Sequence, residues 1–469
     1  MRSWTANEDF RLPFWQRVRE FAVPLPMIRA ATARRAAGDW AGACAAARID
    51  VDLELRAVAR LHGRDLAARV RADLRRLAPD LLRWHMPRIA PDGLLRPGLT
   101  VPLARYGALC LVVRTPPAWA DAGQRMSLAL WDGAGGGGHP HPRPDRRFRL
   151  DLHRHLWDAE RAGELRQRSG AEHPSTDLPG VALSGVASLG EASPGADLSG
   201  AALPGCAVDR WADEVALLRS ADGPAGDAVT VRLDARRRLL LRPGGAGLRV
   251  AAVSTRDRAA AWRTLPVLPD AATWTLPDLE LLRAGLIDAG RLHPLVAAAL
   301  VPGRATAPGP WPPEPPDGTR IVDCRGARHR IGLVDGMLVP LDHDPAEIRR
   351  EELLAALSGP LMPCLRAIDE AHRRPECLAD VRGRLDHGDA AGALAAVEGL
   401  LGPDAVLRGG ALRDELETAA ARRVQHGLFR AGLAGRGPLP ADWDRLTHQP
   451  AAGRRRATRT HPRNATAAR

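Results

Sequence analysis

The stretch "IVDCRGARHRIGLVDGMLVPLDHD", residues 321–344, predicts a β-hairpin that leads directly into a helix. The dipeptide Asp335-Gly336 stands between two apolar runs and favours the type I′ turn, which needs positive φ at both central residues. Asp344 is a natural helix N-cap, Pro345 suits the first helical position, and a glutamate follows three residues after the cap. The segment therefore predicts two antiparallel strands followed by the start of a helix.

The same hairpin is expected to bring a histidine close to acidic and sulfur-containing side chains. Residues at equal distance from the turn pair across it, so His329 is expected near Asp342 or His343. A histidine beside a carboxylate acts as a general base, and a cysteine beside a histidine is an activated nucleophile. The candidate catalytic residues are therefore Cys324, His329, Asp342 and His343. The alternative is that they are surface strand positions next to a capped helix.

The rest of the chain contains both segments with helical spacing of apolar residues and segments typical of strands. The first hundred residues show the helical spacing of apolar residues, and residues 99–131 show short apolar runs typical of strands. A helix is expected over 151–168, and a hairpin and further helices over 210–301. The residues that follow 321–344 are predicted to be helical as far as Leu433. We therefore predict an α+β fold: a helical N-terminal region with a small β-sheet, a flexible Gly/Pro-rich spacer, and a mixed α+β C-terminal region that ends in a helical bundle.

A tract punctuated by glycine separates the two halves. Glycine recurs every five residues from Gly180 to Gly205, and no arginine occurs between Arg168 and Arg210. The pentads "ADLSG" and "AALPG" at 196–205 resemble the pentapeptide-repeat family, whose repeats stack into a right-handed β-helix. Serines at two central positions and prolines that remove backbone donors depart from the pattern of that family. Because so short a Gly/Pro/Ser-rich tract buries little apolar surface, we predict a flexible spacer.

These shifts in composition predict six segments along the chain. A second proline-rich stretch favours an extended connector with polyproline II character. The segments are a helical region with a small sheet (1–168), the spacer (169–209), a mixed α+β segment (210–301), the proline-rich connector (302–318), a β-hairpin with a helical bundle (319–435) and a disordered basic tail (436–469).

One short motif occurs twice, 350 residues apart. The stretch "AAGDWAGACAAA" at 36–47 matches "DHGDAAGALAAV" at 386–397 at its two glycines, its aspartate and four alanines. In each copy the first glycine, Gly38 or Gly388, is expected to end one helix, and the aspartate that follows is expected to cap the next. The motif resembles the turn of helical-hairpin repeats of the tetratricopeptide kind. This resemblance implies two closely packed helical hairpins.

Charge and composition exclude several kinds of site. The 67 residues counted as Lys or Arg are all arginine. Without lysine neither a P-loop nor a Schiff base is available, and no glycine-rich phosphate-binding pattern occurs, so no cofactor is predicted. The net charge is +12, and residues 451–469 hold six arginines and no acid. Nucleic-acid binding through this tail is therefore an alternative function. Its candidate residues are Arg454, Arg455, Arg456 and Arg459.

A second group of histidines is a candidate metal site. His139, His141, His153 and His155 form two H-x-H pairs separated by eleven residues. Histidines ligate zinc and other transition metals, and a nearby aspartate would complete the shell. The alternative is that the first pair lies in an exposed loop and the second on a helix, where residues i and i+2 point apart.

Bulk properties favour a protein without membrane spans or disulfides. No apolar run approaches the 18 residues that a membrane helix needs, and six scattered cysteines make no disulfide framework. No apolar leader is evident, which favours a cytoplasmic location. We therefore expect a cytoplasmic, non-catalytic protein-interaction module whose partners are other proteins. The alternatives are a metal-dependent or His/Asp hydrolase that uses one of the two histidine clusters, and a nucleic-acid-binding protein that uses the basic tail.

Overall fold

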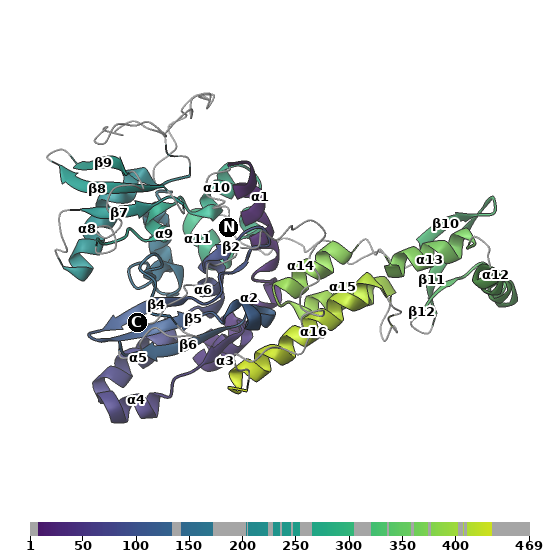
Figure 1. The fold of residues 1–469 in the computed structure, drawn as a ribbon, viewed down its shortest axis with the longest axis horizontal. Helices are drawn as coiled ribbons and strands as arrows, with labels where there is room; N and C mark the ends of the chain where they lie inside the picture. The colour runs from purple at the N-terminus through teal and green to yellow at the C-terminus, as the bar shows by residue number, and fades with distance from the viewer. Residues whose placement is uncertain are drawn as a thin grey trace, which may run out of the picture.

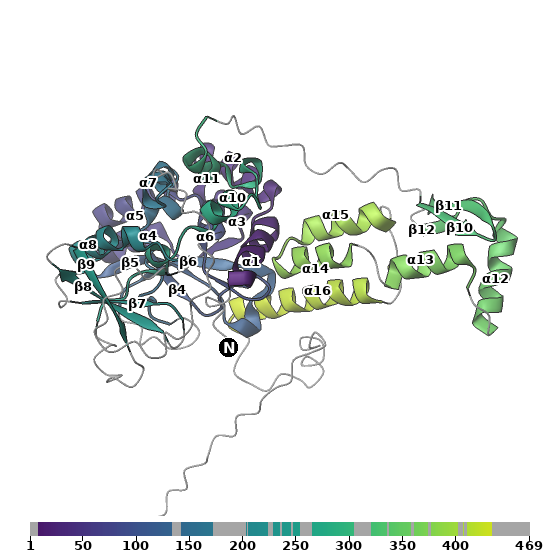
Figure 2. The same cartoon turned by 90° about the horizontal axis from the view of Figure 1, so that it is seen from above.

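The structure, a computed structural model, is elongated, with most helices and strands at one end and a small β-sheet at the other (Figures 1 and 2). Helices and small sheets occur together, so the predicted α+β class is confirmed. Among the described residues, no helix is both long and apolar enough to cross a membrane. The residues described are 8–133, 142–171, 203, 205–223, 228–234, 237–244, 247–253, 265–303, 320–334, 337–357, 361–373, 377–401, 407 and 410–433.

The predicted helical start of the chain is confirmed. The apolar spacing of α5 produces a buried face, since Val70 and Leu74 are fully buried while most of its arginines are exposed. A glycine with φ +94°, Gly63, separates α4 from α5 and ends the first of these two helices. The helices of this region are α1 (Glu8–Phe21), α2 (Leu25–Ala36), α3 (Trp40–Ala46), α4 (Leu55–His62), α5 (Arg64–Arg76) and α6 (Pro79–His85).

The strand-like stretch 99–131 forms the antiparallel part of a four-stranded sheet. Its strands β4 (Thr100–Tyr106), β5 (Leu109–Arg114) and β6 (Met126–Trp131) pair in sequence order. A short strand from the helical region, β1 (Ile49–Val51), adds to β6 in parallel, which gives the order β1-β6-β5-β4. A separate two-stranded pair is formed by β2 (Arg88–Ile89) and β3 (Leu94–Leu95).

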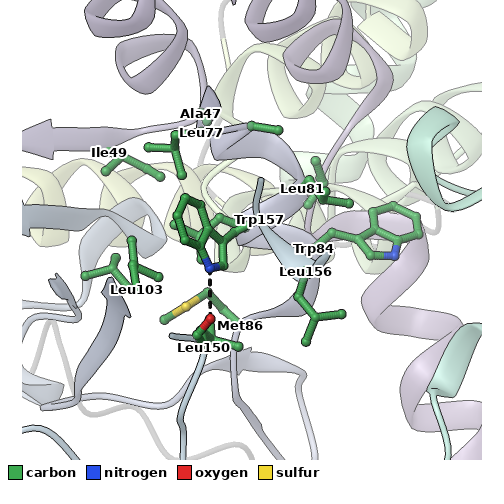
Figure 3. Packing of buried hydrophobic residues seen from close by; sticks show 14 of the residues in the cluster. Ala47, Ile49, Leu77, Leu81, Trp84, Met86, Leu103, Leu150, Leu156 and Trp157 are labelled. Atoms are coloured by element: carbon green, nitrogen blue, oxygen red, sulfur yellow. Dashed lines mark hydrogen bonds between the residues drawn. The ribbon is translucent and has the colours of Figure 1, made fainter. Parts of the chain in front are cut away.

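The largest hydrophobic core lies between this sheet and the helices. Trp84 and Trp157 are among its largest buried side chains (Figure 3). The indole nitrogen of Trp157 donates to the Leu150 carbonyl at 2.9 Å, so this buried polar atom is satisfied. Two helices from much later in the chain, α10 (Pro277–Arg283) and α11 (Pro294–Leu300), contribute Leu281 and Val296 to the same core. Residues 277–300 therefore pack with the N-terminal helices.

Buried arginines donate hydrogen bonds to backbone carbonyls at the C-terminal ends of several helices in this core. Arg83 is fully buried and donates to the carbonyls of Ala22 at 3.2 Å and Ala47 at 3.4 Å, which directly follow α1 and α3. Arg19 and Arg88 each donate at 2.8 Å to carbonyls in the last turn of α6. The C-terminal end of a helix has carbonyl groups without a partner inside the helix and carries a partial negative charge. The guanidinium groups donate hydrogen bonds to these carbonyls and place a positive charge next to them.

A second, smaller core lies beneath a three-stranded antiparallel sheet. Its strands are β7 (Val229–Arg232), β8 (Arg238–Gly244) and β9 (Gly247–Val253), in that order. The helices α8 (Trp211–Asp222) and α9 (Asp270–Thr273) pack against it, and Trp211 and Leu241 are buried between these elements. The hairpin and helix predicted within 210–301 are therefore confirmed.

The C-terminal region consists of a small distal module and a helical arm (Figure 2). The module comprises β10 (Arg320–Cys324), β11 (Ala327–Val334), β12 (Met337–Pro340), α12 (Pro345–Leu357) and α13 (Pro363–Arg373). The arm comprises α14 (Leu378–Asp386), α15 (Ala390–Leu401) and α16 (Ala411–Arg430). The arm contacts the N-terminal body: Arg48 donates to the His387 carbonyl at 2.9 Å, and Arg430 pairs with Asp52.

The repeated motif forms two helical hairpins with the same turn, as predicted. Gly38 has φ +77° and follows α2, and Gly388 has φ +83° and follows α14. Asp39 then accepts from the backbone nitrogen of Gly42 at 2.8 Å, and Asp389 accepts from that of Gly392 at 3.2 Å. An arginine five residues before each aspartate also donates to its carboxylate. The small residues allow each pair of helices to pack closely.

The helix expected over 151–168 is wrong. The segment contains the 3₁₀ turns Arg154–Leu156 and Ala162–Glu164 and one short α-helix, α7 (Leu165–Arg168). The backbone around Asp158 pairs with the end of α5 instead of with its own helix: the Ala78 nitrogen donates to the Trp157 carbonyl at 2.8 Å, and the Ala159 nitrogen donates to the Arg76 carbonyl at 2.9 Å. Most of the glycine tract, the connector from residue 304 and the tail from residue 434 lie outside the described residues.

Candidate metal centre

Four side chains that bind metals meet in the distal module. They are the thiols of Cys324 and Cys364 and the imidazoles of His329 and His343. One ligand atom from each side chain lies within 4.8 Å of the other three. Three of the four are predicted site residues, and Cys364 joins them.

The sheet of the module positions the first three of these residues. Cys324 ends β10, and the turn after it is formed by Arg325 with φ 56° and Gly326 with φ +83°. Positive φ at both central residues identifies the type I′ turn, which matches the twist of the strands. This turn holds β10 against β11, where His329 stands. Asp335 and Gly336 lie outside the described residues, but the pairing of β11 with β12 predicted around them is confirmed.

The second hairpin then brings His343 to His329. The Leu341 nitrogen donates to the Arg330 carbonyl at 2.8 Å, which extends the pairing of the strands beyond β12. The rings of His329 and His343 lie with their centroids 4.1 Å apart. His343 lies one position beyond the residue opposite His329, because Ile331 pairs with Pro340 and the register places Asp342 across from His329. The expectation that His329 lies near Asp342 or His343 is confirmed for His343.

Cys364 completes the group from a different element. It lies in the first turn of α13, which begins at Pro363. Cys324 and Cys364 are both fully buried, and they share a small core with Ile331 and Leu365. The sulfur atoms therefore belong to the interior of the module.

A second layer of polar contacts orients His343. Its Nδ1 faces the Glu347 carboxylate at 3.4 Å, and the same carboxylate accepts from Arg325 at 2.6 Å. With Nδ1 directed at a carboxylate, Nε2 is left to face the other ligand atoms. A metal-binding histidine commonly donates its other ring N–H to a carboxylate in this way, which fixes the tautomer.

Asp342 is the one candidate catalytic residue that does not join the cluster. Its carboxylate accepts from the Arg330 side chain at 2.7 Å and from the Arg330 backbone nitrogen at 2.7 Å. These hydrogen bonds lower the pKa of Asp342 to about 2. The carboxylate is therefore occupied by Arg330.

The charge balance of the cluster is compatible with a bound divalent cation. Burial, together with the neighbouring Cys324 sulfur, raises the pKa of the Cys364 thiol above its ordinary value. A divalent cation between the sulfurs reverses this preference, because thiolate is the form that binds a metal. Two thiolates and two neutral imidazoles around a divalent ion give a site with no net charge. This balance suits a buried position.

The ligand set fits zinc. Tetrahedral zinc takes sulfur at about 2.3 Å and nitrogen at about 2.0–2.1 Å, and two cysteines with two histidines are a common structural set. Such a shell places neighbouring ligand atoms about 3.3–3.8 Å apart. The four ligand atoms lie within 4.8 Å of one another, and His329 Nδ1 and His343 Nε2, at 2.5 Å, would have to separate by roughly 0.8 Å to bind one ion. No other group of three or more metal-binding side chains gathers in this way among the described residues.

The other histidine cluster has different surroundings. His153 is buried, with Nδ1 at 2.8 Å from the Arg149 carbonyl and Nε2 at 3.2 Å from the Glu214 carboxylate. Burial lowers the pKa of His155 well below its ordinary value, so this ring is neutral. His139 and His141 lie outside the described residues, as do the tail candidates Arg454, Arg455, Arg456 and Arg459.

Cys364 was missed because the sequence reasoning paired residues only across one hairpin turn. The usable signal was the set of four cysteines and histidines between residues 324 and 364, the last of them directly after Pro363 at a helix start. No family model, no curated protein and no solved structure matches the chain. Its function must therefore be inferred from its own residues.

Proposed function

We propose that this is a zinc-binding, non-catalytic interaction protein, in which one Zn²⁺ holds the distal module folded. The observation that carries the proposal is the meeting of two thiols and two imidazoles within 4.8 Å. These side chains come from β10, β11, the β12–α12 connection and α13, so one ion would tie together most elements of the module.

A structural role for the metal fits the geometry better than a catalytic one. Four protein ligands fill a tetrahedral shell and leave no position for a reacting water, whereas catalytic zinc sites keep such a position open. Both cysteines are fully buried. The His/Asp hydrolase hypothesis has less support, because the Asp342 carboxylate is bound by Arg330 and is not available to a histidine base.

The small size of the module is a physical reason for a metal. Among the residues of the module that the structure describes, its core contains six buried side chains. Cores of this size rarely outweigh the conformational entropy of the chain, and natural small modules commonly add a metal or disulfides. Zinc binding would supply free energy of folding directly.

The charge of the module favours proteins over nucleic acids as partners. Residues 320–373 contain eight arginines and nine acidic residues. Two of these arginines, Arg325 and Arg330, already form ion pairs within the module. Phosphate backbones bind to an excess of positive charge, which this module lacks.

Metal analysis of the purified full chain tests the proposal. We expect about one zinc per chain, and we expect Cys364→Ser to lose most of it because this substitution removes one of the four ligands. Cys377→Ser is the matched control, since Cys377 is a partly buried cysteine outside the ligand set. Absence of zinc from the wild-type chain, or equal zinc in C364S and C377S, would contradict the proposal.

A further inference from the structure

Three arginines form one row along the exposed side of α5 in the N-terminal body. Arg64, Arg71 and Arg75 are all exposed, and seven and then four residues separate them in sequence. At 3.6 residues per turn, this spacing places them within about 40° of one another around the helix axis. The buried face of α5, which includes Val70 and Leu74, lies on the far side of the helix. We name the three residues the arginine row.

The positive charge of the arginine row is not neutralised by the described part of the chain. Within those residues none of the three guanidinium groups has an ion-pair partner. The other two arginines of α5 are occupied, since Arg76 pairs with Asp73 and Arg69 lies over the Tyr106 ring, 5.3 Å from its centroid. The one exposed acid of the helix, Asp65, lies about 100° from the row around the axis. The row is therefore free to bind an anion.

The preceding helix adds positive charge next to the row. Arg56 and Arg60 on α4 are exposed and likewise have no ion-pair partner among the described residues. Residues 54–76, which span both helices, contain seven arginines and three acidic residues. One of these acids, Asp73, is buried. The helix pair therefore presents an excess of positive charge to solvent, and such a surface attracts an anionic partner.

The side chains around the row distinguish between anionic partners. The exposed positions of α5 hold only arginine, alanine and one aspartate. Protein interfaces are anchored by aromatic or large aliphatic side chains, and helices that bind a membrane surface insert an apolar face. The neighbouring Leu61 on α4 is 77% exposed, but single exposed apolar residues are normal on protein surfaces. A phosphate backbone needs no apolar anchor, so the composition of the row favours nucleic acid.

We propose that the arginine row binds the phosphate backbone of a nucleic acid duplex. At a rise of 1.5 Å per residue, Arg71 and Arg75 lie about 6 Å apart along the helix axis and Arg64 lies about 10 Å further along it. A guanidinium group donates two parallel hydrogen bonds to one phosphate, so the row can contact three phosphates at once. The small side chain of Ala68, between Arg64 and Arg71, lets the backbone approach the helix closely. Contacts of this kind are independent of base sequence, and they do not involve the metal centre.

The test is the salt dependence of duplex binding by the full chain, measured by fluorescence anisotropy with short labelled DNA and RNA duplexes of mixed sequence. The logarithm of the binding constant falls with the logarithm of salt concentration, with a slope of about 0.9 for each phosphate contacted on duplex DNA. The variant R64A/R71A/R75A is expected to reduce this slope by about 2–3, and R71A alone by about 1. Alanine has the highest helix propensity, so α5 is expected to stay folded in these variants.

A matched control removes the same charge from scattered positions. Arg283, Arg291 and Arg349 are exposed, have no ion-pair partner among the described residues and lie on three different elements. The variant R283A/R291A/R349A is therefore expected to keep the slope of the wild type. Equal slopes in the two triple variants would overturn the inference. So would a chain that binds neither duplex, including one that binds vesicles containing phosphatidylserine or binds polyglutamate instead. Each of these results would leave the zinc site standing, since zinc content is measured separately.

Discussion

The two helical hairpins offer a matched pair of glycines whose substitution must have different consequences. Gly38 and Gly388 occupy equivalent turns, with φ +77° and +83°. A Cβ at Gly38 would meet nothing within 4 Å, whereas a Cβ at Gly388 would lie 2.3 Å from the Gly123 carbonyl oxygen and 2.6 Å from Arg48 Nη1. Only the second hairpin therefore has its turn packed against the N-terminal body.

The loss in free energy of unfolding has two parts, backbone strain and steric crowding by the new methyl group. An L-residue in the left-handed region costs about 1–2 kcal/mol, and this applies equally to Gly38→Ala and Gly388→Ala. At Gly388 the new methyl group must also displace a backbone carbonyl, and overpacking of this kind costs about 1–3 kcal/mol more. We therefore expect G38A to lower the free energy of unfolding by about 1–2 kcal/mol and G388A by about 2–5 kcal/mol.

Urea unfolding of the full chain measures both variants under the same conditions. Limited proteolysis adds a second readout, because a displaced arm exposes the contact between Arg48 and the His387 carbonyl to solvent. G388A should be cleaved faster than the wild type in this region, and G38A should not. Equal losses of stability in the two variants, or a larger loss in G38A, would refute the reasoning about the packed turn.

Two further predictions concern the helix caps and one buried ion pair. Asp39→Ala and Asp389→Ala each remove an N-cap hydrogen bond, and each should lower the free energy of unfolding by about 1 kcal/mol in urea; no change in either would contradict the capping role. Burial alone would raise the pKa of Glu214, but His153 and Arg168 bring it down to about 2. A lowered carboxyl pKa stabilises the fold above pH 4.5, and this stability, about 3 kcal/mol at most, is lost as pH falls from 4.5 through 2. Glu214→Gln should flatten that part of the profile of stability against pH, and an unchanged acid limb would contradict the assignment.

Local chemistry made much of the fold predictable. The glycine and aspartate of each repeated turn carry their own conformational preferences, so both helical hairpins followed from a dozen residues. The same holds for the β11–β12 pair and for the meeting of His329 with His343. Both depend on a turn only two residues long.

The parts that escaped prediction depend on contacts distant in sequence. Strand β1 pairs in parallel with β6, with Ile49 opposite Met126. No pattern in the residues around β1 predicts a partner strand so distant in sequence. Helices α10 and α11 enter the N-terminal core for the same reason. Over 151–168 the continuous helix is interrupted where the backbone of residues 157–159 pairs with residues 76–78, a contact distant in sequence.

The candidate site was half predictable on the same grounds. Two consecutive hairpins, β10–β11 and β11–β12, place three of the ligands, whereas Cys364 is brought to them on α13 by tertiary packing. Asp342 is among the predicted site residues because it lies opposite His329 across the turn. In the structure its carboxylate is bound by Arg330 on the neighbouring strand and not by a histidine. Proximity across a turn therefore identified the neighbourhood, and competition between partners decided which side chains are free to bind a metal.

X-ray absorption spectroscopy at the zinc edge of the purified full chain tests the zinc centre most directly. We predict two sulfur ligands at about 2.3 Å and two nitrogen ligands at about 2.0–2.1 Å. In C364S the spectrum of any remaining zinc should show a single sulfur. A chain without zinc, or a shell of oxygen and nitrogen with no sulfur, would contradict the metal centre formed by Cys324, His329, His343 and Cys364.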